Sequence, residues 1–146
     1  MENSEKSVFI SYRRTNFYTA LAVYQGLSQH GFDVFMRFEQ GKELREVSKA
    51  EVKRCAHFLA IISPSALEAY QEEDHLLREE VALALDSDRN VIPLVMEGFD
   101  SSSPSVQKAI SGKLAKLKNF SALRLYSEYF SAGLEKFRER CLNIPL

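Results

Sequence analysis

At 146 residues, with 45% hydrophobic and 27% charged residues, the chain has the size and composition of one globular domain. Its 19 basic and 20 acidic residues leave a net charge of −1, which gives no reason to expect nucleic acid or an anionic membrane as partner. Two cysteines, Cys55 and Cys141, without a close Cys/His cluster, exclude a four-ligand zinc site and suit reduced thiols in the cytoplasm.

No targeting or membrane-spanning segment is expected. Residues 1–6 are polar and lack the apolar stretch of a signal peptide. No apolar run approaches the ~20 residues that a helix needs to cross a bilayer. The sequence therefore predicts a cytoplasmic location.

Apolar runs alternate with helical periodicities along the chain. The first run, Val8–Ile10, leads straight into Ser11-Tyr12-Arg13-Arg14 and is typical of a strand buried on both faces. Further strands are expected at Phe32–Phe35, Phe58–Ile62, Val91–Val95 and Ala122–Leu125. Helices are expected at Tyr18–Gln29, Glu43–Arg54, Asp74–Asp86, Val106–Leu117 and Tyr129–Leu142.

This alternation predicts an α/β fold with helices on both faces of a parallel sheet. Right-handed crossovers and a central first strand favour a flavodoxin-like, three-layer α/β/α domain with five strands in the order 2-1-3-4-5. Gly31 is expected just past the end of the first helix. Pro93 removes a ladder donor, so the fourth strand is expected at or near a sheet edge. No repeat or second domain is visible, and residues 1–146 are interpreted as one domain.

In this strand order the topological switch lies between strands one and three, where open α/β sheets bind their ligands. The crevice is then lined by Tyr12-Arg13-Arg14 after the first strand and by Ser63-Pro64-Ser65 after the third. This prediction follows from topology alone.

Common catalytic signatures are absent from the sequence. It has no G-x-x-x-x-G-K-[ST] loop, no G-x-G-x-x-G after a strand, no G-x-S-x-G and no H-E-x-x-H. The three histidines, His30, His57 and His75, are far apart and suggest no triad. A structural or solvated role is favoured for each of them over a catalytic one.

Glu80 breaks the pattern of its own helix. On a wheel at 100° per residue it falls inside the apolar arc, between Leu76 and Ala84. A carboxylate there loses hydration unless it is paired, hydrogen-bonded or faces a cleft. The wheel alone favours a buried pair with an arginine or escape to water near a helix end. The position just past strand three, near the switch point, favours a functional carboxylate instead.

The other polar residues near the crevice keep two interpretations. Arg13 and Arg14 suit a solvated strand end and, equally, a phosphate contact, because guanidinium forks match phosphate bidentately. Tyr12 suits core packing or a stacking surface. Glu39, in the second loop, is favoured as solvated on local evidence.

Seven segments of the chain together resemble the Toll/interleukin-receptor (TIR) domain family. The opening strand V-F-I-S-Y-R-R and the Ser-Pro exit of the third strand are similar to boxes of that family. The matching segments are, in chain order, Val8–Arg14, Gly31–Phe35, Phe58–Pro64, Arg78–Leu85, Asn90–Val95, Gly98–Asp100 and Glu128–Phe130. The resemblance spans about the whole chain and is closer to bacterial and NAD-cleaving TIR domains than to animal receptor adaptors.

The resemblance implies either of two functions. Many TIR domains cleave NAD+ between nicotinamide and ribose, releasing linear or cyclised ADP-ribose, whereas others only self-associate as scaffolds. In the enzymatic branch the key acid lies in the helix after strand three, which places it at Glu80. By the same resemblance and the crevice, the substrate NAD+ is expected to contact a set of six residues, with no cofactor and no metal. They are Tyr12, Arg13, Arg14, Glu39, Ser63 and Leu76.

Two departures from the family bear on this site. Family enzymes often carry a Trp four residues before the acid, where this chain has Leu76 and no Trp anywhere. The loss of that ring removes a stacking surface. Arg37 stands where many relatives have an acid, and the segment Phe38–Glu46 is short, which leaves the mode of self-association open.

The first choice is thus an NAD+ glycohydrolase activated by self-association, an effector of bacterial immune or stress signalling with a fused or separate sensor domain. The 146 residues are then either the whole protein or one TIR domain excised from a longer one, and an end soon after the last expected helix suits the second alternative. The alternative is a non-catalytic TIR scaffold. A flavodoxin-like receiver is disfavoured, because its phosphoacceptor site needs acids where Arg13 and Arg14 stand.

Overall fold

The computed structural model describes residues 6–37, 42–72 and 75–96, and, beyond them, residues 104, 108, 110, 114, 117, 123–125 and 135. The five strands are β1 (Ser7–Ser11), β2 (Asp33–Met36), β3 (His57–Ile62), β4 (Asn90–Met96) and β5 (Leu123–Leu125). The helices are η2 (Arg14–Asn16, a 3-10 turn), α1 (Phe17–Gln29), α2 (Lys42–Arg54), α3 (Pro64–Tyr70) and α4 (Leu76–Asp86). The helices predicted over 106–117 and 129–142 lie for the most part outside the described residues.

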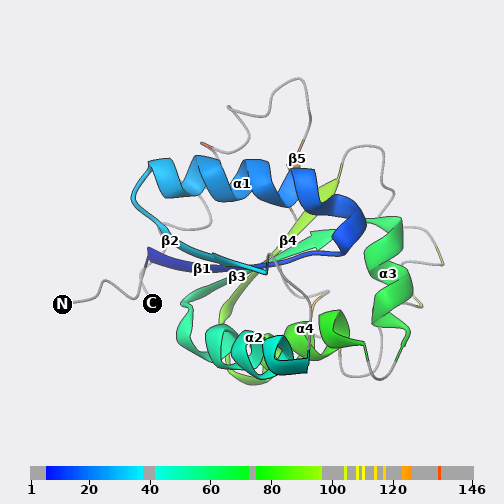
Figure 1. Ribbon diagram of the computed structural model, residues 1–146. Coiled ribbons are helices and arrows are strands. Elements are labelled where there is room, and N and C mark those ends of the chain that lie inside the picture. Colours follow the sequence, from blue (N-terminus) through cyan, green and yellow to red (C-terminus); the bar gives the residue numbers. More distant parts are fainter. Residues whose placement is uncertain are drawn as a thin grey trace.

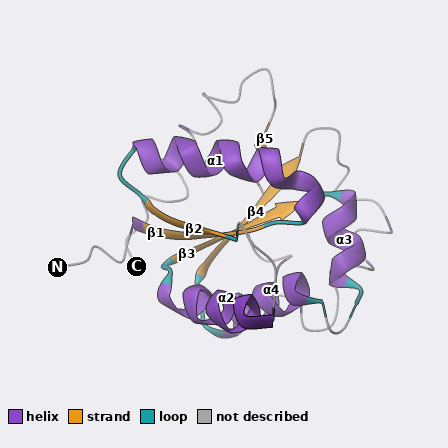
Figure 2. Ribbon diagram, viewed as in Figure 1, coloured by secondary structure: helices purple, strands orange, loops and turns teal. Residues whose placement is uncertain are grey.

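The sheet is parallel throughout, with strand order β2-β1-β3-β4-β5, so the predicted topology is confirmed. α1 covers one face of the sheet, α2 and α4 cover the other, and α3 stands at the ends of the strands (Figure 1). Figure 2 shows the same three layers by element type. Pro93 pairs with Ala60 of β3, and pairing with β5 starts one residue later at Leu94, so the near-edge place of β4 is confirmed.

β1 is buried on both faces because its side chains alternate between two apolar clusters. Val8 and Ile10 pack on the α1 side, and Phe9 packs on the side of α2 and α4. Across the strands, the ring of Phe9 stacks on Phe35 at 5.2 Å and on Phe58 at 5.4 Å between centroids. This row of rings ties β2, β1 and β3 together and fixes the edge where they end.

The cap predicted at Gly31 is present. Gly31 has φ of 85°, its N–H donates to the carbonyl of Ser28, and the N–H of Phe32 donates to Leu27, both at 3.2 Å. These two bonds form a Schellman motif, which needs a residue in the left-handed region. The chain therefore turns sharply from α1 into β2.

The helix α3 was not predicted. Ser63 caps it by accepting the N–H of Ala66 at 3.2 Å, and Pro64 occupies the first turn. The Ser-Pro pair, interpreted from sequence as a strand exit only, is therefore also a helix start. α4 begins at Leu76 rather than Asp74, because His75 is its N-cap and accepts the N–H of Leu77 through Nδ1.

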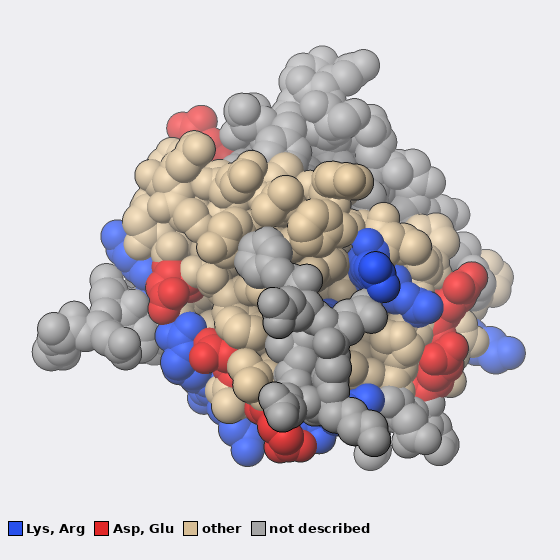
Figure 3. All heavy atoms as spheres, in the orientation of Figure 1, with Lys and Arg blue, Asp and Glu red and all other residues tan. Residues whose placement is uncertain are grey.

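On the face shown in Figure 3, charged side chains of both signs lie around and below the α1 layer, which is itself largely uncharged. Neither Lys, Arg, Asp nor Glu occurs within Phe17–Gln29. In the described part of the chain, every helix is too short or too polar to pass through a bilayer.

Candidate active site

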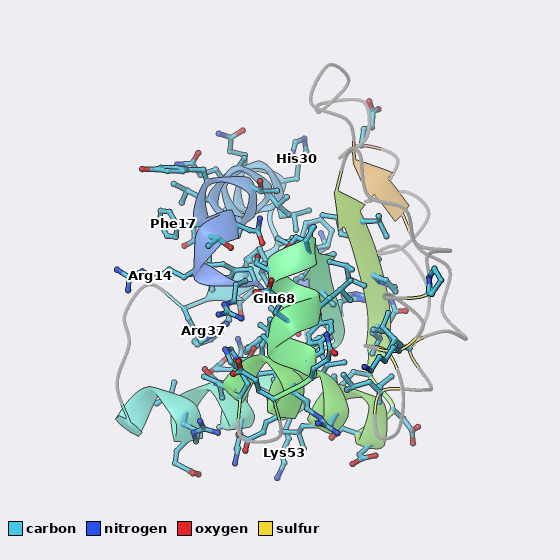
Figure 4. All side chains as sticks on the ribbon, turned by 90° about the vertical axis from the view of Figure 1, so that its right-hand side faces the viewer. Arg14, Phe17, His30, Arg37, Lys53 and Glu68 are labelled. Atoms are coloured by element: carbon cyan, nitrogen blue, oxygen red, sulfur yellow. The ribbon has the colours of Figure 1, made fainter. Side chains whose placement is uncertain are left out.

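The strands β1, β2 and β3 end at one edge of the sheet, and Figure 4 looks onto this edge. Tyr12 directly follows β1, Arg37 directly follows β2 and Ser63 directly follows β3. Since α4 packs against β1, it brings Glu80 to the same edge. The switch point predicted from the strand order is thus where a carboxylate and an arginine meet.

Glu80 lies on the buried face of α4, as the helical wheel predicts. It has 0% of its surface exposed and shares that face with Leu77, Val81 and Ala84. These apolar residues drive the packing of α4 against the sheet and carry the carboxyl group inside with them. A buried charge of this kind needs partners.

Two groups from different strands bind the Glu80 carboxyl. The hydroxyl of Ser11, the last residue of β1, donates to Oε1 at 3.0 Å. Arg37 places Nε 3.0 Å from Oε2 and donates weakly from Nη2 to Oε1 at 3.4 Å. The buried arginine pair that the wheel left open therefore exists, and it lies at the switch point.

Arg37 is in turn held by Tyr12. The Arg37 Nη2 donates to the carbonyl oxygen of Tyr12 at 2.9 Å, and the Tyr12 hydroxyl donates to the carbonyl of Arg37. The guanidinium also lies over the Tyr12 ring, 5.3 Å from its centroid. Tyr12 thus fixes the direction from which Arg37 reaches Glu80.

Burial dominates the protonation of Glu80 and raises its pKa to about 7. The charge of Arg37 opposes this most, followed by the hydroxyls of Ser11 and Ser48 and by Arg45, each of which lowers the pKa. The pKa of Tyr70 is raised by burial and, in addition, by the charge of Glu80, which places the Tyr70 hydroxyl among the groups around Glu80. A carboxyl group with a pKa near neutrality, buried among polar groups, is typical of active sites.

Several polar atoms around Glu80 keep spare hydrogen-bonding capacity. Within the described part of the chain, Glu80 Oε2, Arg37 Nε and the hydroxyls of Ser48 and Tyr70 are buried without a hydrogen bond. The contact between Oε2 and Nε is therefore close enough for an ion pair but not aligned as a hydrogen bond. Oε2 retains the capacity to accept a further hydroxyl proton.

A second polar network joins η2 to the start of α3. Ser63, 2% exposed, donates to Asn16 Oδ1 at 2.6 Å, and Thr15 and Ser65 share a hydrogen bond of 2.7 Å. Arg13 donates to the carbonyl oxygen of Ser65 at 3.2 Å. These bonds hold the segment after β1 against the segment after β3.

The residues expected to contact substrate fall into three groups. Tyr12 lies directly beside Arg37 and Glu80, while Ser63 and Arg13 belong to the network at the other wall. Arg14 lies in η2 and extends outward (Figure 4). Leu76, in the first turn of α4, is half-buried, and Glu39 lies outside the described residues.

Arg37 and Ser11 are the site residues that sequence reasoning missed. The sequence marks Arg37 only as a departure from the family, whereas its place directly after β2 puts it at the same edge of the sheet as Tyr12. The available signal was the pairing of a lone arginine at a strand end with an acid inside an apolar helix face. The histidines have structural contacts instead: His75 caps α4, buried His57 bonds Asn90 at 2.8 Å, and His30 bonds the Gly26 carbonyl at 2.8 Å.

Comparison with known proteins gives the chain a family and a fold. A family model described as the TIR domain matches residues 8–136. The sequence is 29% identical over 153 residues to the NAD(+) hydrolase sarm1 of Drosophila melanogaster, a match that covers 97% of this chain and 11% of the fly protein. The chain is thus a distant relative of an NAD+ hydrolase and spans about a tenth of its length.

Two solved structures share the fold. The CMP N-glycosidase BcmB of Clostridium botulinum matches with a TM-score of 0.59 at 16% identity, over 92% of this chain and 98% of that one. A metazoan TIR-STING receptor from C. gigas, in complex with 2′,3′-cGAMP, matches with a TM-score of 0.63 at 17% identity, over 95% of this chain and 40% of that one. At these identities the likeness concerns the flavodoxin-like architecture.

Proposed function

The chain belongs to the TIR domain family, and on this premise we propose that it is an NAD+ glycohydrolase whose essential carboxylate is Glu80. The observation that carries the proposal is the position of Glu80, a fully buried carboxyl group at the switch point of the sheet with an unbonded Oε2. The relationship to an NAD+ hydrolase, which covers 97% of this chain, supports NAD+ as the substrate.

Hydrolysis of NAD+ at C1′ of the ribose requires from the protein mainly that it stabilise the positive charge that develops on the ribose. The bond between C1′ of the ribose and the nicotinamide nitrogen breaks, and its electron pair neutralises the pyridinium, so the base leaves without a proton. The ribose becomes oxocarbenium-like, water attacks C1′, and the water loses a proton to give ADP-ribose. A carboxylate beside the ribose stabilises this cation and accepts a hydrogen bond from a ribose hydroxyl.

The remaining site residues follow from their positions. The Tyr12 ring lies beside the pair and suits contact with the nucleotide, while Leu76 offers an apolar wall in the first turn of α4. Arg13 and Ser63 shape the opposite wall through their bonds to Ser65 and Asn16. We also propose that Arg14 contacts a phosphate of NAD+. Glu39, which follows β2 in the sequence, is proposed as a further substrate contact.

Glu80 has no exposed surface in this state, so substrate reaches it only when the side chains around it move. We attribute that movement to self-association through TIR–TIR contacts, and we place the activity in an immune or stress response that consumes NAD+. An assay of the isolated domain therefore needs high protein concentration and a crowding agent.

The test compares nicotinamide release by the wild type, Glu80→Gln and Glu79→Gln. Glu79 is a matched control, since it is the next residue of α4 but is partly exposed and pairs with Arg45 and Lys49. We expect a loss of about a hundredfold or more in Glu80→Gln, typical of removing a group that stabilises transition-state charge. Glu79→Gln is expected to stay within about twofold of the wild type. Equal turnover in all three proteins would remove Glu80 from the mechanism.

The alternative is a non-catalytic TIR scaffold, and complete burial of the Glu80 carboxyl against Arg37 is the observation that favours it. A buried ion pair can be purely structural. Demonstrated self-association without nicotinamide release from the wild type would favour the scaffold.

A further inference from the structure

Building on the proposed function, we propose that Arg37 is a positioning residue that favours the carboxylate form of Glu80 and thereby favours nucleotide substrates whose leaving base is already cationic. The inference comes from the contacts of Arg37 in this chain.

Arg37 contacts both oxygens of the Glu80 carboxyl group, with Nε 3.0 Å from Oε2 and Nη2 3.4 Å from Oε1. Tyr12 holds the guanidinium through its carbonyl oxygen and its ring, and holds the Arg37 backbone through its hydroxyl. Arg37 therefore has one preferred orientation. Its side chain is only 14% exposed, so the attraction between the two charges is weakly screened.

Other groups around Glu80 are weaker partners for its charge. They are Ser11 and Tyr12 from β1 and the residue after it, Arg45 and Ser48 from α2, Tyr70 from α3, and Glu79 next to it on α4. Of these only Arg45 is a cation, and it pairs with Glu79. Arg37 opposes the burial that raises the Glu80 pKa more than any other group does. Loss of Arg37 leaves only Ser11, Ser48 and Arg45 to oppose the effect of burial, so the Glu80 pKa rises.

The ionisation state of Glu80 decides which bases the site can release. A base bound through a pyridinium or another cationic nitrogen takes the C1′–N electron pair and leaves neutral, so it needs only a carboxylate at the ribose. A neutral base such as cytosine leaves as an anion unless an acid gives it a proton. Because Arg37 disfavours the protonated form of Glu80, it reduces the fraction of the acid that could supply this proton, and this fraction becomes small above the Glu80 pKa of about 7. The site therefore favours NAD+ over CMP.

The test is the pH profile of kcat and kcat/KM for NAD+ between pH 5.5 and about 9.5, under clustering conditions, for the wild type, Arg37→Gln and Arg37→Lys. For the wild type we expect activity to fall on the acid side as Glu80 takes up a proton. In Arg37→Gln this acid limb moves up by about one pH unit or more, so kcat falls about fivefold or more at pH 7 and recovers near pH 9.5. Arg37→Lys is expected to restore the limb to within about half a unit.

Each other outcome has a defined meaning. An equal loss at every pH, an unmoved acid limb, or a gain at every pH in Arg37→Gln would overturn the inference, the last by making Arg37 a cover for the site. If Arg37→Gln does not fold, Tyr12→Phe removes only the hydroxyl that holds the Arg37 backbone and should move the limb in the same direction by less. An unmoved limb there would also count against the inference.

A substrate comparison separates this inference from the proposed function. At pH 8.5, where a carboxyl group with a pKa of about 7 is almost fully ionised, the wild type is expected to release nicotinamide from NAD+ at least about a hundredfold faster than cytosine from CMP. This ratio should fall in Arg37→Gln. Comparable wild-type rates on the two substrates would refute the inference while leaving glycosidase activity intact. If Glu80→Gln keeps full activity or the wild type is inactive, the proposed function falls, and the inference falls with it.

Discussion

Glu80 combines two features that oppose each other at the scale of one residue. Its helix face is apolar and buries it completely, which favours the neutral acid, while Arg37 and Ser11 favour the carboxylate. The balance leaves its pKa at about 7. Because of this balance, the charge of Glu80 depends on each of its partners, and the free energy of unfolding should change with the protonation of Glu80.

The raised pKa of Glu80 should make the free energy of unfolding depend on pH. The folded state raises the pKa of Glu80 from 4.5 to about 7, so the proton binds more tightly in the folded chain than in the unfolded one. The stability that this proton contributes is fully present below pH 4.5 and is lost as pH rises through 7. In Glu80→Gln this loss is absent. As pH rises from 4.5 to 7, the free energy of unfolding of the variant should therefore increase by on the order of 3 kcal/mol relative to that of the wild type.

Urea unfolding at a series of pH values measures this difference. Subtracting the two curves cancels the titration of groups that both proteins share. Glu79→Gln again serves as control, and its curve should run parallel to that of the wild type. A Glu80→Gln curve parallel to the wild type across this window would contradict a raised Glu80 pKa.

The ends of two helices use the same backbone motif at the scale of elements. Gly31 follows the C-cap of α1 and lies in the left-handed region. Asp88 follows the C-cap of α4 at φ of 54°, and its neighbour Arg89 donates to the Ala84 carbonyl at 3.2 Å. Only the first end carries a glycine signal that sequence reasoning can use. α1 must turn into β2 at this point, so its cap also places Arg37 at the end of that strand.

The element-scale prediction is therefore about Gly31. Gly31→Ala should cost about 1 kcal/mol of unfolding free energy, because an L side chain is disfavoured at φ of 85°. A Cβ built there meets nothing within 4 Å, so the cost comes from the backbone and not from a clash. Gly31→Asn adds a Cβ as well but tolerates this region better, and should cost clearly less than the alanine. Equal losses for the two variants in urea unfolding would contradict this account.

The sheet assembles the site from distant parts of the chain at the scale of the whole molecule. Ser11 and Glu80 are 69 residues apart in sequence, and Arg37 and Glu80 are 43 apart. Their meeting depends on β1 lying between β2 and β3. The domain encloses the acid completely, which led us to propose that association of several domains opens the site.

The whole-molecule prediction follows from that proposal. Nicotinamide released per mole of protein should rise with protein concentration, by several-fold over about a tenfold increase, until assembly is complete. Light scattering on the same samples measures assembly, and the two curves should rise together. A constant specific activity across a range in which scattering shows association would contradict activation by assembly.

The alternation of apolar runs and helical periodicities determined the layers, the strand order and the switch point, because burial patterns and handed crossovers leave few arrangements open. The wheel also determined that Glu80 faces the core. Only the tertiary structure decided what meets Glu80 there, since the partners Ser11 and Arg37 come from other strands and no local pattern encodes their distances. α3 escaped prediction because its seven residues are too few for a periodicity, and packing, not propensity, stabilises it. The local sequence pattern thus determined that Glu80 faces the core, whereas the pairing of the strands determined that Arg37 is the cation beside it.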